Sequence, residues 1–182
     1  MNDEYFEVLD LVNSQDEVVG TTLRGEMAET SYYRSGRYVR FANAFVVNKM
    51  GLVWVQTRNL HKFIAPGGLD YSVAEHVLSG ETYEQAVIRG FDEELGWDID
   101  QSKLHSLGKL PPTKEKPVFD MVYALFDYSG EKPKLNHDEF ATAEWLSIAG
   151  LKGRLAASDI AQKTSLVPAF SLLQDALHKR KK

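Results

Sequence analysis

The chain has 182 residues, a length that favours one domain with a buried core. Its formal net charge of −5 argues against a nucleic-acid partner, because such proteins usually carry a basic surface. It has no cysteine, which excludes disulfides, thiolate nucleophiles and zinc–thiolate sites. No apolar run approaches the roughly 20 residues of a membrane span, and the acidic start lacks the apolar region of a signal peptide. We therefore expect a cytoplasmic protein with no membrane partner.

The first part of the chain is rich in strand patterns. A hairpin is predicted from strands at 7–11 and 17–23 around the turn-forming residues 13–16. A longer strand at 38–47 leads into a second hairpin turn, where Gly51 supplies a positive φ, and a partner strand follows at 52–57. The break Pro66-Gly67-Gly68 then precedes a short extended segment.

The second part mixes helices and strands. Residues 82–95 form the first convincing helix, strands are predicted at 104–110, 118–128 and 141–146, and a closing helix at 165–178. Many strands interrupted by few helices predict an α+β, layered α/β/α fold. We expect one domain over 1–182, with a hairpin extension at 1–36, a core at 37–150 and a C-terminal helical segment at 151–182.

The helix at 82–95 separates its residues onto two faces. At about 100° per residue, one arc collects an apolar stripe and the other an acidic one; the apolar set is Val87, Ile88, Phe91 and Leu95, and the other set is Ala86, Arg89, Gly90, Glu93 and Glu94. We expect the carboxylates of Glu93 and Glu94 to converge where Gly90 leaves the backbone bare. Adjacent carboxylates repel unless a cation or donors lie between them, and Mg²⁺ prefers oxygen ligands. Two solvated glutamates on a helix surface are the alternative.

The segment from Gly80 to Trp97 resembles the Nudix box. In that family's pattern a glutamate is followed eight residues later by an arginine, then by a glutamate pair, a spacer, a glycine and an apolar residue. The matching residues here are Glu81, Arg89, Glu93, Glu94, Gly96 and Trp97. The Pro66-Gly67-Gly68 loop and the strand Glu144-Trp145-Leu146 also sit where Nudix domains have a loop and a strand.

The resemblance implies a Nudix-type α/β/α sandwich with a mixed sheet and a metal-dependent hydrolase. Its cofactor would be Mg²⁺ or Mn²⁺, and its substrate a nucleoside diphosphate derivative or another small-molecule diphosphate. Glu93 and Glu94 would be metal ligands, Glu81 would support the metal cluster, and Arg89 would orient the glutamates. Charge neutralisation by the metal and activation of water agree with this chemistry.

Two positions depart from the family pattern. Gly90 stands where the family has a glutamate, and Glu75 stands where it has the first glycine of the box. These departures leave open a second hypothesis, a catalytically weak or silent Nudix-fold protein that binds a diphosphate. A base could instead come from elsewhere; Asp138 and Glu139, before the last strand, are candidates, with a solvated loop as the alternative.

The branch of the family that the chain resembles is that of the isopentenyl-diphosphate isomerases. Ala86-Val87-Ile88-Arg89 and the segment 75–81 carry this likeness, and His76 matches a metal-ligating histidine of those enzymes. Their catalytic cysteine lies two residues earlier, where this chain has Ala74. We therefore expect an isomerase-like Nudix protein that is not an isomerase, with His76 as a candidate metal ligand.

Three cations are candidates for phosphate binding near the Pro66-Gly67-Gly68 loop. Arg40, Arg58 and Lys62 can donate to phosphate oxygens, although a solvated surface charge is the alternative for each. The N-terminal hairpin also offers edge strands through which two copies could pair as a homodimer.

Overall fold

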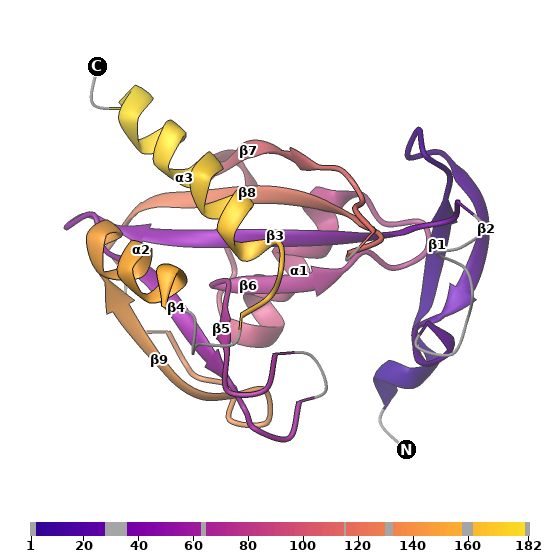
Figure 1. Ribbon diagram of the computed structural model, residues 1–182, viewed down its shortest axis with the longest axis horizontal. Coiled ribbons are helices and arrows are strands. Elements are labelled where there is room, and N and C mark those ends of the chain that lie inside the picture. The colour runs from indigo at the N-terminus through magenta and orange to yellow at the C-terminus, as the bar shows by residue number, and fades with distance from the viewer. Residues whose placement is uncertain are drawn as a thin grey trace.

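The computed structural model describes residues 3–27, 36–62, 65–114, 116–129, 133–157 and 162–180. Its strands and helices follow one another along the chain as Figure 1 shows. The strands are β1 (Val8–Val12), β2 (Val18–Leu23), β3 (Val39–Asn48), β4 (Val53–Arg58), β5 (Leu69–Asp70), β6 (Val73–His76), β7 (Leu104–Leu110), β8 (Val118–Tyr128) and β9 (Phe140–Leu146). The helices are α1 (Tyr83–Leu95), α2 (Ile148–Ala156) and α3 (Leu166–Arg180), with short 3₁₀ turns at Asp3–Phe6, Arg24–Glu26 and Gln101–Lys103.

A mixed sheet of seven strands forms the body of the molecule. Strand β3 runs through its middle, parallel to β8 and antiparallel to β4 and β6. Strands β5 and β9 pair with β4, and β7 pairs with β8. Strand β6 therefore lies beside the first half of β3, where Glu75 is opposite Ala42. This arrangement confirms the predicted α+β fold with a mixed sheet and a separate N-terminal hairpin.

Helices cover both faces of the sheet (Figure 1). On one face α1 buries Val87, Phe91 and Leu95 completely, and full burial of such a side chain contributes about 1.5–3 kcal/mol. On the other face α2 and α3 pack Leu151 and Phe170 against the sheet. Within the described ranges, no helix is long and apolar enough to cross a membrane.

The hairpin β1–β2 is attached to the body through its turn. Asp16, in that turn, accepts hydrogen bonds from Arg40 Nε at 2.6 Å, Tyr83 Oη at 2.9 Å and Lys109 Nζ at 2.5 Å. Burial alone would raise the pKa of Asp16, but the bonds from Lys109, Arg40 and Tyr83 outweigh it and lower that pKa. Leu9 and Leu11 add an apolar contact with Val39. The hairpin is thus held by a charged contact and a small core.

The predicted elements match the structure closely, with two corrections. Residues 148–156 form α2, which the sequence did not predict as a separate helix, so the expected boundary at 150 falls inside it. The non-apolar arc of α1 is also not a solvated face, because Ala86, Gly90 and Glu94 are buried there. Gly90 is covered by β6 and its backbone is not bare. The prediction that the helix backbone is bare at Gly90 is therefore wrong, because β6 packs against the helix there.

Candidate functional site

Helix α1 is fixed at both ends by local chemistry. At its start the Thr82 side chain accepts from the Gln85 amide at 3.2 Å, while the Gln85 side chain accepts from the Thr82 amide at 2.8 Å. This capping box satisfies two backbone donors that would otherwise lack partners. At its end Gly96 adopts a φ of 67°, which glycine tolerates without strain. The carboxylates of the helix are therefore presented from a rigid element.

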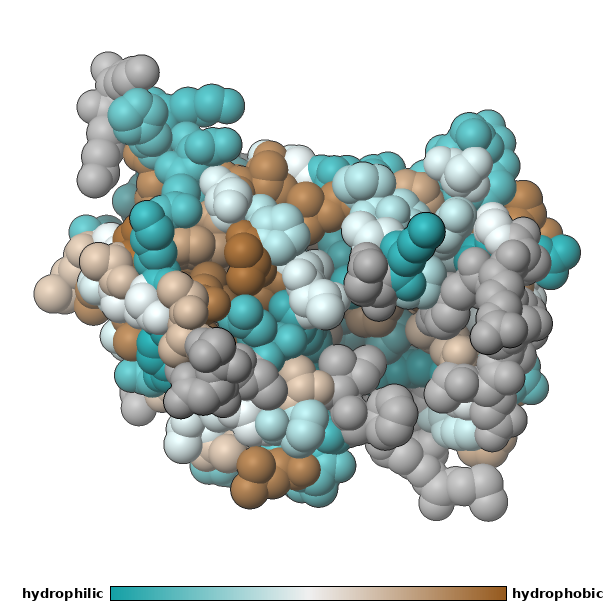
Figure 2. All heavy atoms as spheres, viewed as in Figure 1, coloured by the Kyte–Doolittle hydropathy of each residue, from teal (hydrophilic) through white to brown (hydrophobic). Residues whose placement is uncertain are grey.

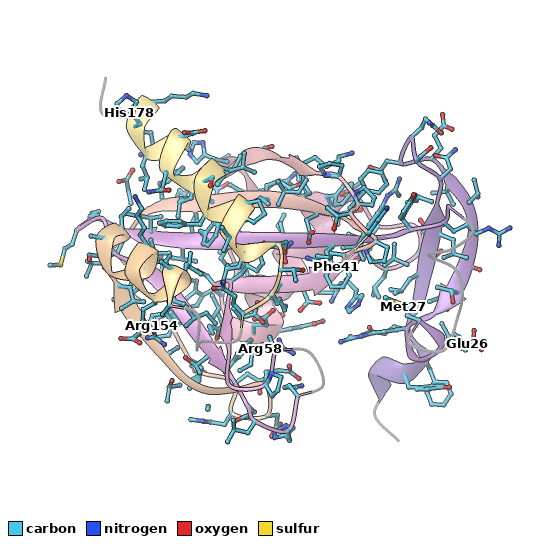
Figure 3. All side chains as sticks on the ribbon, in the orientation of Figure 1. Glu26, Met27, Phe41, Arg58, Arg154 and His178 are labelled. Carbon is cyan, nitrogen blue, oxygen red and sulfur yellow. The ribbon has the colours of Figure 1, made fainter. Side chains whose placement is uncertain are left out.

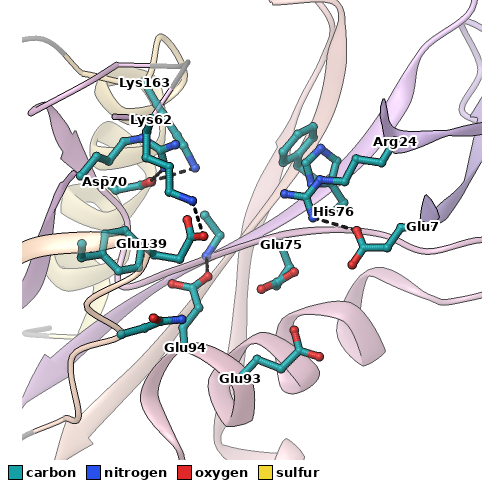
Figure 4. Close-up of a pocket in the computed structure, with 15 residues that line it drawn as sticks. Glu7, Arg24, Lys62, Asp70, Glu75, His76, Glu93, Glu94, Glu139 and Lys163 are labelled. Carbon is teal, nitrogen blue, oxygen red and sulfur yellow. Dashed lines mark hydrogen bonds and ion pairs between the residues drawn. The ribbon is translucent and has the colours of Figure 1, made fainter. Parts of the chain in front are cut away.

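A pocket of about 340 Å³ opens beside α1 and β6. Hydrophilic residues gather in the hollow in the middle of the face that Figure 2 shows. Figure 3 places Phe41 and Arg58 on the central part of that face, with Met27 opposite them at the hairpin. The pocket is lined by Glu7, Arg24, Phe41, Arg58, Lys62, Asp70, Ala74, Glu75, His76, Glu93, Glu94, Asn136, Glu139, Phe140 and Lys163. Carboxylates on one wall thus face cations on the other (Figure 4).

Arg89 ties the acidic residues of α1 and β6 together. Its guanidinium donates to Glu81 Oε1 at 3.1 Å, to Glu75 Oε2 at 3.0 Å and to Glu93 Oε2 at 3.1 Å. It also donates to the His76 carbonyl at 2.8 Å. Burial alone would lower the pKa of Arg89, but these carboxylates raise it, so the cation stays charged. Arg89 therefore contacts Glu93 and Glu81, and its role in orienting the glutamates stays a prediction.

Glu81 pairs with Arg89 at the start of the box. Both of its oxygens accept from Arg89, and one also accepts from the Leu78 amide at 3.0 Å. It is not among the residues that line the pocket. The contacts favour a role for Glu81 in holding Arg89, and its part in a metal site stays a prediction.

Glu94 is buried at 8% exposure, although it lies at the edge of the pocket. One carboxylate oxygen accepts from the Ala74 amide at 2.9 Å and the other from Gln56 Nε2 at 3.0 Å. Burial, and after it the nearby charge of Glu75, raises the pKa of Glu94 well above its usual range. The two hydrogen bonds hold the carboxyl group in one orientation, because strand backbone and a buried amide both donate to it.

Glu75 brings a further carboxylate to the same wall. Its side chain extends from β6 toward α1, beside Glu93 and Glu94 (Figure 4). Burial, opposed by Arg89 but supported by the charge of Glu93, raises the pKa of Glu75 to about 7. Three carboxyl groups share one arginine on this wall, so their simultaneous ionisation is unfavourable, and a bound cation would favour it.

The donor set fits a hard divalent cation. Glu75, Glu93 and Glu94 offer carboxylate oxygens, and Mg²⁺ commonly takes one or two protein carboxylates and completes its shell with water and substrate phosphates. In the described part of the chain no three acidic or histidine side chains form a ready-made cage. The arrangement therefore suits a cation bound together with a phosphate ligand.

His76 lies on the other side of the pocket from Glu93. Its ring packs against Phe41, with the ring centres 4.1 Å apart, and it is near Arg24 (Figure 4). Burial, and after it the charge of Arg24, lowers the pKa of His76 well below its usual value. The imidazole is therefore neutral at pH 7. Its predicted metal role is not tested by these contacts, which show a ring packed on an aromatic neighbour.

The opposite wall carries the cations. Arg58 donates to Asp70 Oδ2 at 2.6 Å, and Lys163 lies 3.0 Å from the same oxygen. Lys62 pairs with Glu139. Of the three predicted phosphate-binding residues, Arg58 and Lys62 line the pocket of Glu93 and Glu94. Arg40 does not line it and pairs with Asp16 instead. Of the two candidate bases, Glu139 lines this pocket, whereas Asp138 does not.

Several lining residues were not predicted as part of the site. Glu75 was noted only as a departure from the family pattern. The sequence did carry a signal for it, because a glutamate at 75 and a glycine at 90 have exchanged places relative to that pattern. Lys163 and Arg24 come from segments far from the box, and the hairpin position of Arg24 brings it near Glu7, 2.7 Å away. Neither cation lies in a motif that the sequence could reveal.

The fold and this acidic helix define a family. The NUDIX domain family matches residues 37–169, so the chain belongs to the Nudix family. It is 40% identical over 157 residues to a Nudix hydrolase from Deinococcus radiodurans, covering 86% of this chain and 88% of that one. A crystal structure from the same organism matches with a TM-score of 0.77 and 37% identity, covering 91% of this chain and 98% of the other.

The isomerase-like branch is also confirmed among the relatives. The chain is 27% identical over 150 residues to isopentenyl-diphosphate Delta-isomerase 2 from Photorhabdus laumondii, covering 80% of each chain. The higher identity to a Nudix hydrolase agrees with a chain that has no cysteine. These similarities identify the chain as a Nudix-type hydrolase, a family whose members generally use divalent metals.

Proposed function

We propose that the chain is a Mg²⁺- or Mn²⁺-dependent hydrolase of a nucleoside diphosphate derivative or another organic diphosphate. The observation that carries the proposal is the pocket that Glu75, Glu93 and Glu94 line together with Arg58 and Lys62. A diphosphate needs cations for its oxygens, and a divalent metal needs carboxylates. One pocket offers both sets.

The chain's own residues would divide the work as follows. Glu93 and Glu94 hold the cation, and Arg89 keeps Glu93 oriented from 3.1 Å. Arg58 and Lys62 contact phosphate oxygens, exchanging their present carboxylate partners for the substrate. A divalent cation bound in such a site neutralises phosphate charge and activates the attacking water.

Position 139 offers the remaining protein group for proton transfer. Glu139 lies in the pocket beside Lys62, and a carboxylate there can accept a proton from water. Withdrawal of Lys62 toward a phosphate would free the Glu139 carboxylate for this role. The predicted base Glu139 therefore remains part of the proposal.

Release of phosphate or nucleotide tests the proposal directly. A panel of nucleoside diphosphates, nucleoside triphosphates and nucleotide sugars is incubated with the protein and Mg²⁺ or Mn²⁺. We expect metal-dependent turnover that falls at least 100-fold in the Glu93→Gln, Glu94→Gln double variant, since oriented metal and electrostatic contacts of this kind contribute roughly 10²–10³ in rate.

Glu84→Gln provides the matched control. Glu84 lies on the same helix, is exposed and is outside the pocket, so the variant should keep the wild-type rate. Wild-type turnover no greater than that of the double variant, with every substrate and both metals, contradicts the proposal. Stabilisation by a diphosphate without its consumption would favour the binding protein instead.

A further inference from the structure

Gly90 and Glu75 occupy one space between α1 and β6. A Cβ atom on Gly90 would lie 2.4 Å from Glu75 Cγ and 2.6 Å from Val73 Cγ1. Carbon atoms do not approach that closely without displacement, so any side chain at position 90 must compete with the one at position 75. The glycine is therefore complementary to the glutamate that faces it across the two elements.

The carboxylate of Glu75 reaches the wall that the pair on α1 forms. Arg89 donates to Glu75 and to Glu93 through the same nitrogen, Nη1, at 3.0 and 3.1 Å. Glu94 accepts from the amide of Ala74, the residue beside Glu75 on β6. All three acidic side chains line the same pocket (Figure 4). The side chain of Glu75 is 13% exposed, so it is sheltered yet accessible from the pocket.

We propose that Glu75 supplies, from strand β6, the metal-facing carboxylate that the family pattern places on the helix at position 90. The acidic group has moved between neighbouring elements, and the site keeps three carboxylates with Glu93 and Glu94. This inference rests on the proposed function. It assigns Glu75 as a metal-binding residue and explains how the chain departs from the pattern twice without losing a carboxylate.

A purely structural role for Glu75 makes a different prediction. If Glu75 served only as the ion-pair partner of Arg89, its replacement would alter stability and leave the affinity for metal unchanged. A carboxylate that binds the cation has to change that affinity. The decisive measurement is therefore metal binding, and turnover is a second readout.

Mn²⁺ is the probe, titrated alone and with methylenediphosphonate, a diphosphate analogue that is not hydrolysed. Free Mn²⁺ is measured by electron paramagnetic resonance. We expect Glu75→Gln to raise the Kd for Mn²⁺ about 10-fold or more, because the charge of the ligating oxygens sets the affinity for the cation. Glu84→Gln, outside the pocket, should bind as the wild type does.

Returning the carboxylate to the helix provides the complementary test. The exchange variant Glu75→Gly, Gly90→Glu carries Val73→Ala as well, which removes the second close contact at position 90. We expect it to bind Mn²⁺ within about 3-fold of the wild type, near the error expected of such comparisons. The matched variant with Gly90→Gln in place of Gly90→Glu has the same shape without the charge and should stay weak.

The outcomes separate the inference from the proposed function. Wild-type affinity in Glu75→Gln, or equal affinity in the two exchange variants, overturns the inference while leaving the role of Glu93 and Glu94 intact. No binding of Mn²⁺ by the wild type, with or without methylenediphosphonate, overturns both. If the exchange variants do not fold by circular dichroism, Glu75→Gln against Glu84→Gln decides the question alone.

Discussion

Replacement of Gly90 by alanine should destabilise the protein, although alanine normally stabilises a helix. In an open helix interior, Gly→Ala contributes about 0.5–1 kcal/mol. Here the new methyl group meets Glu75 Cγ at 2.4 Å and Val73 Cγ1 at 2.6 Å. Over-packing of this kind costs about 1–3 kcal/mol, so we expect a net loss of about 1 kcal/mol in the free energy of unfolding. That loss corresponds to a fall in Tm of roughly 2–4 °C.

A double-mutant cycle with Glu75→Ala isolates the contact. Alanine at position 75 removes the Cγ atom that lies closest to the added methyl group, so Gly90→Ala should cost less in that background. We expect a coupling free energy of about 1 kcal/mol, typical of residues in direct contact. The assay is urea unfolding without metal at pH 7, with an unchanged m value as the condition for comparing variants.

Gly153→Ala is the matched control. Gly153 lies in α2, and a Cβ atom there would meet nothing within 4 Å. That variant should stabilise the protein by about 0.5–1 kcal/mol. Gly90→Ala could instead stabilise the protein as much as Gly153→Ala does, and by the same amount whether position 75 is Glu or Ala. That result would show that residues 75 and 90 do not share one space.

Three further perturbations test other contacts. Asp16→Asn removes the charge at a position with a φ of 64°, which asparagine also tolerates. We expect the variant to lose about 2 kcal/mol in the free energy of unfolding at pH 7. Because the folded pKa of Asp16 is lowered, its stabilisation is complete above the unfolded value near 4 and is lost as the pH falls further, so the variant and the wild type should converge in acid unfolding curves. Asp70→Asn leaves Arg58 and Lys163 without their shared buried carboxylate, and we expect a loss of about 3–5 kcal/mol in urea unfolding; a loss below about 1 kcal/mol would contradict the charge pairing. Gly96→Ala forces alanine into a left-handed cap and should cost about 1 kcal/mol, read from Tm; an unchanged Tm would show that the cap relaxes freely.

The helix α1 and its glutamate pair could be predicted because their signals are local. Apolar spacing placed Val87, Phe91 and Leu95 on one side, and the predicted range 82–95 lies within one residue of the observed helix. Spacing along a helix determines which residues share a face wherever the helix is packed. The box from Glu81 to Trp97 could therefore be read from the chain alone, as could the strands on either side of it.

The surroundings of that helix depended on pairing between distant segments. The register that sets Glu75 opposite Ala42 also packs β6 against α1, and this contact buries Glu94 and fills the space at Gly90. In the same way, chain closure brings Lys163 within 3.0 Å of Asp70. The order of residues along the chain specified the acidic helix, because helical periodicity is local. Only the folded sheet decided which carboxylate lies over Gly90 and which cations face it, because those contacts depend on long-range register.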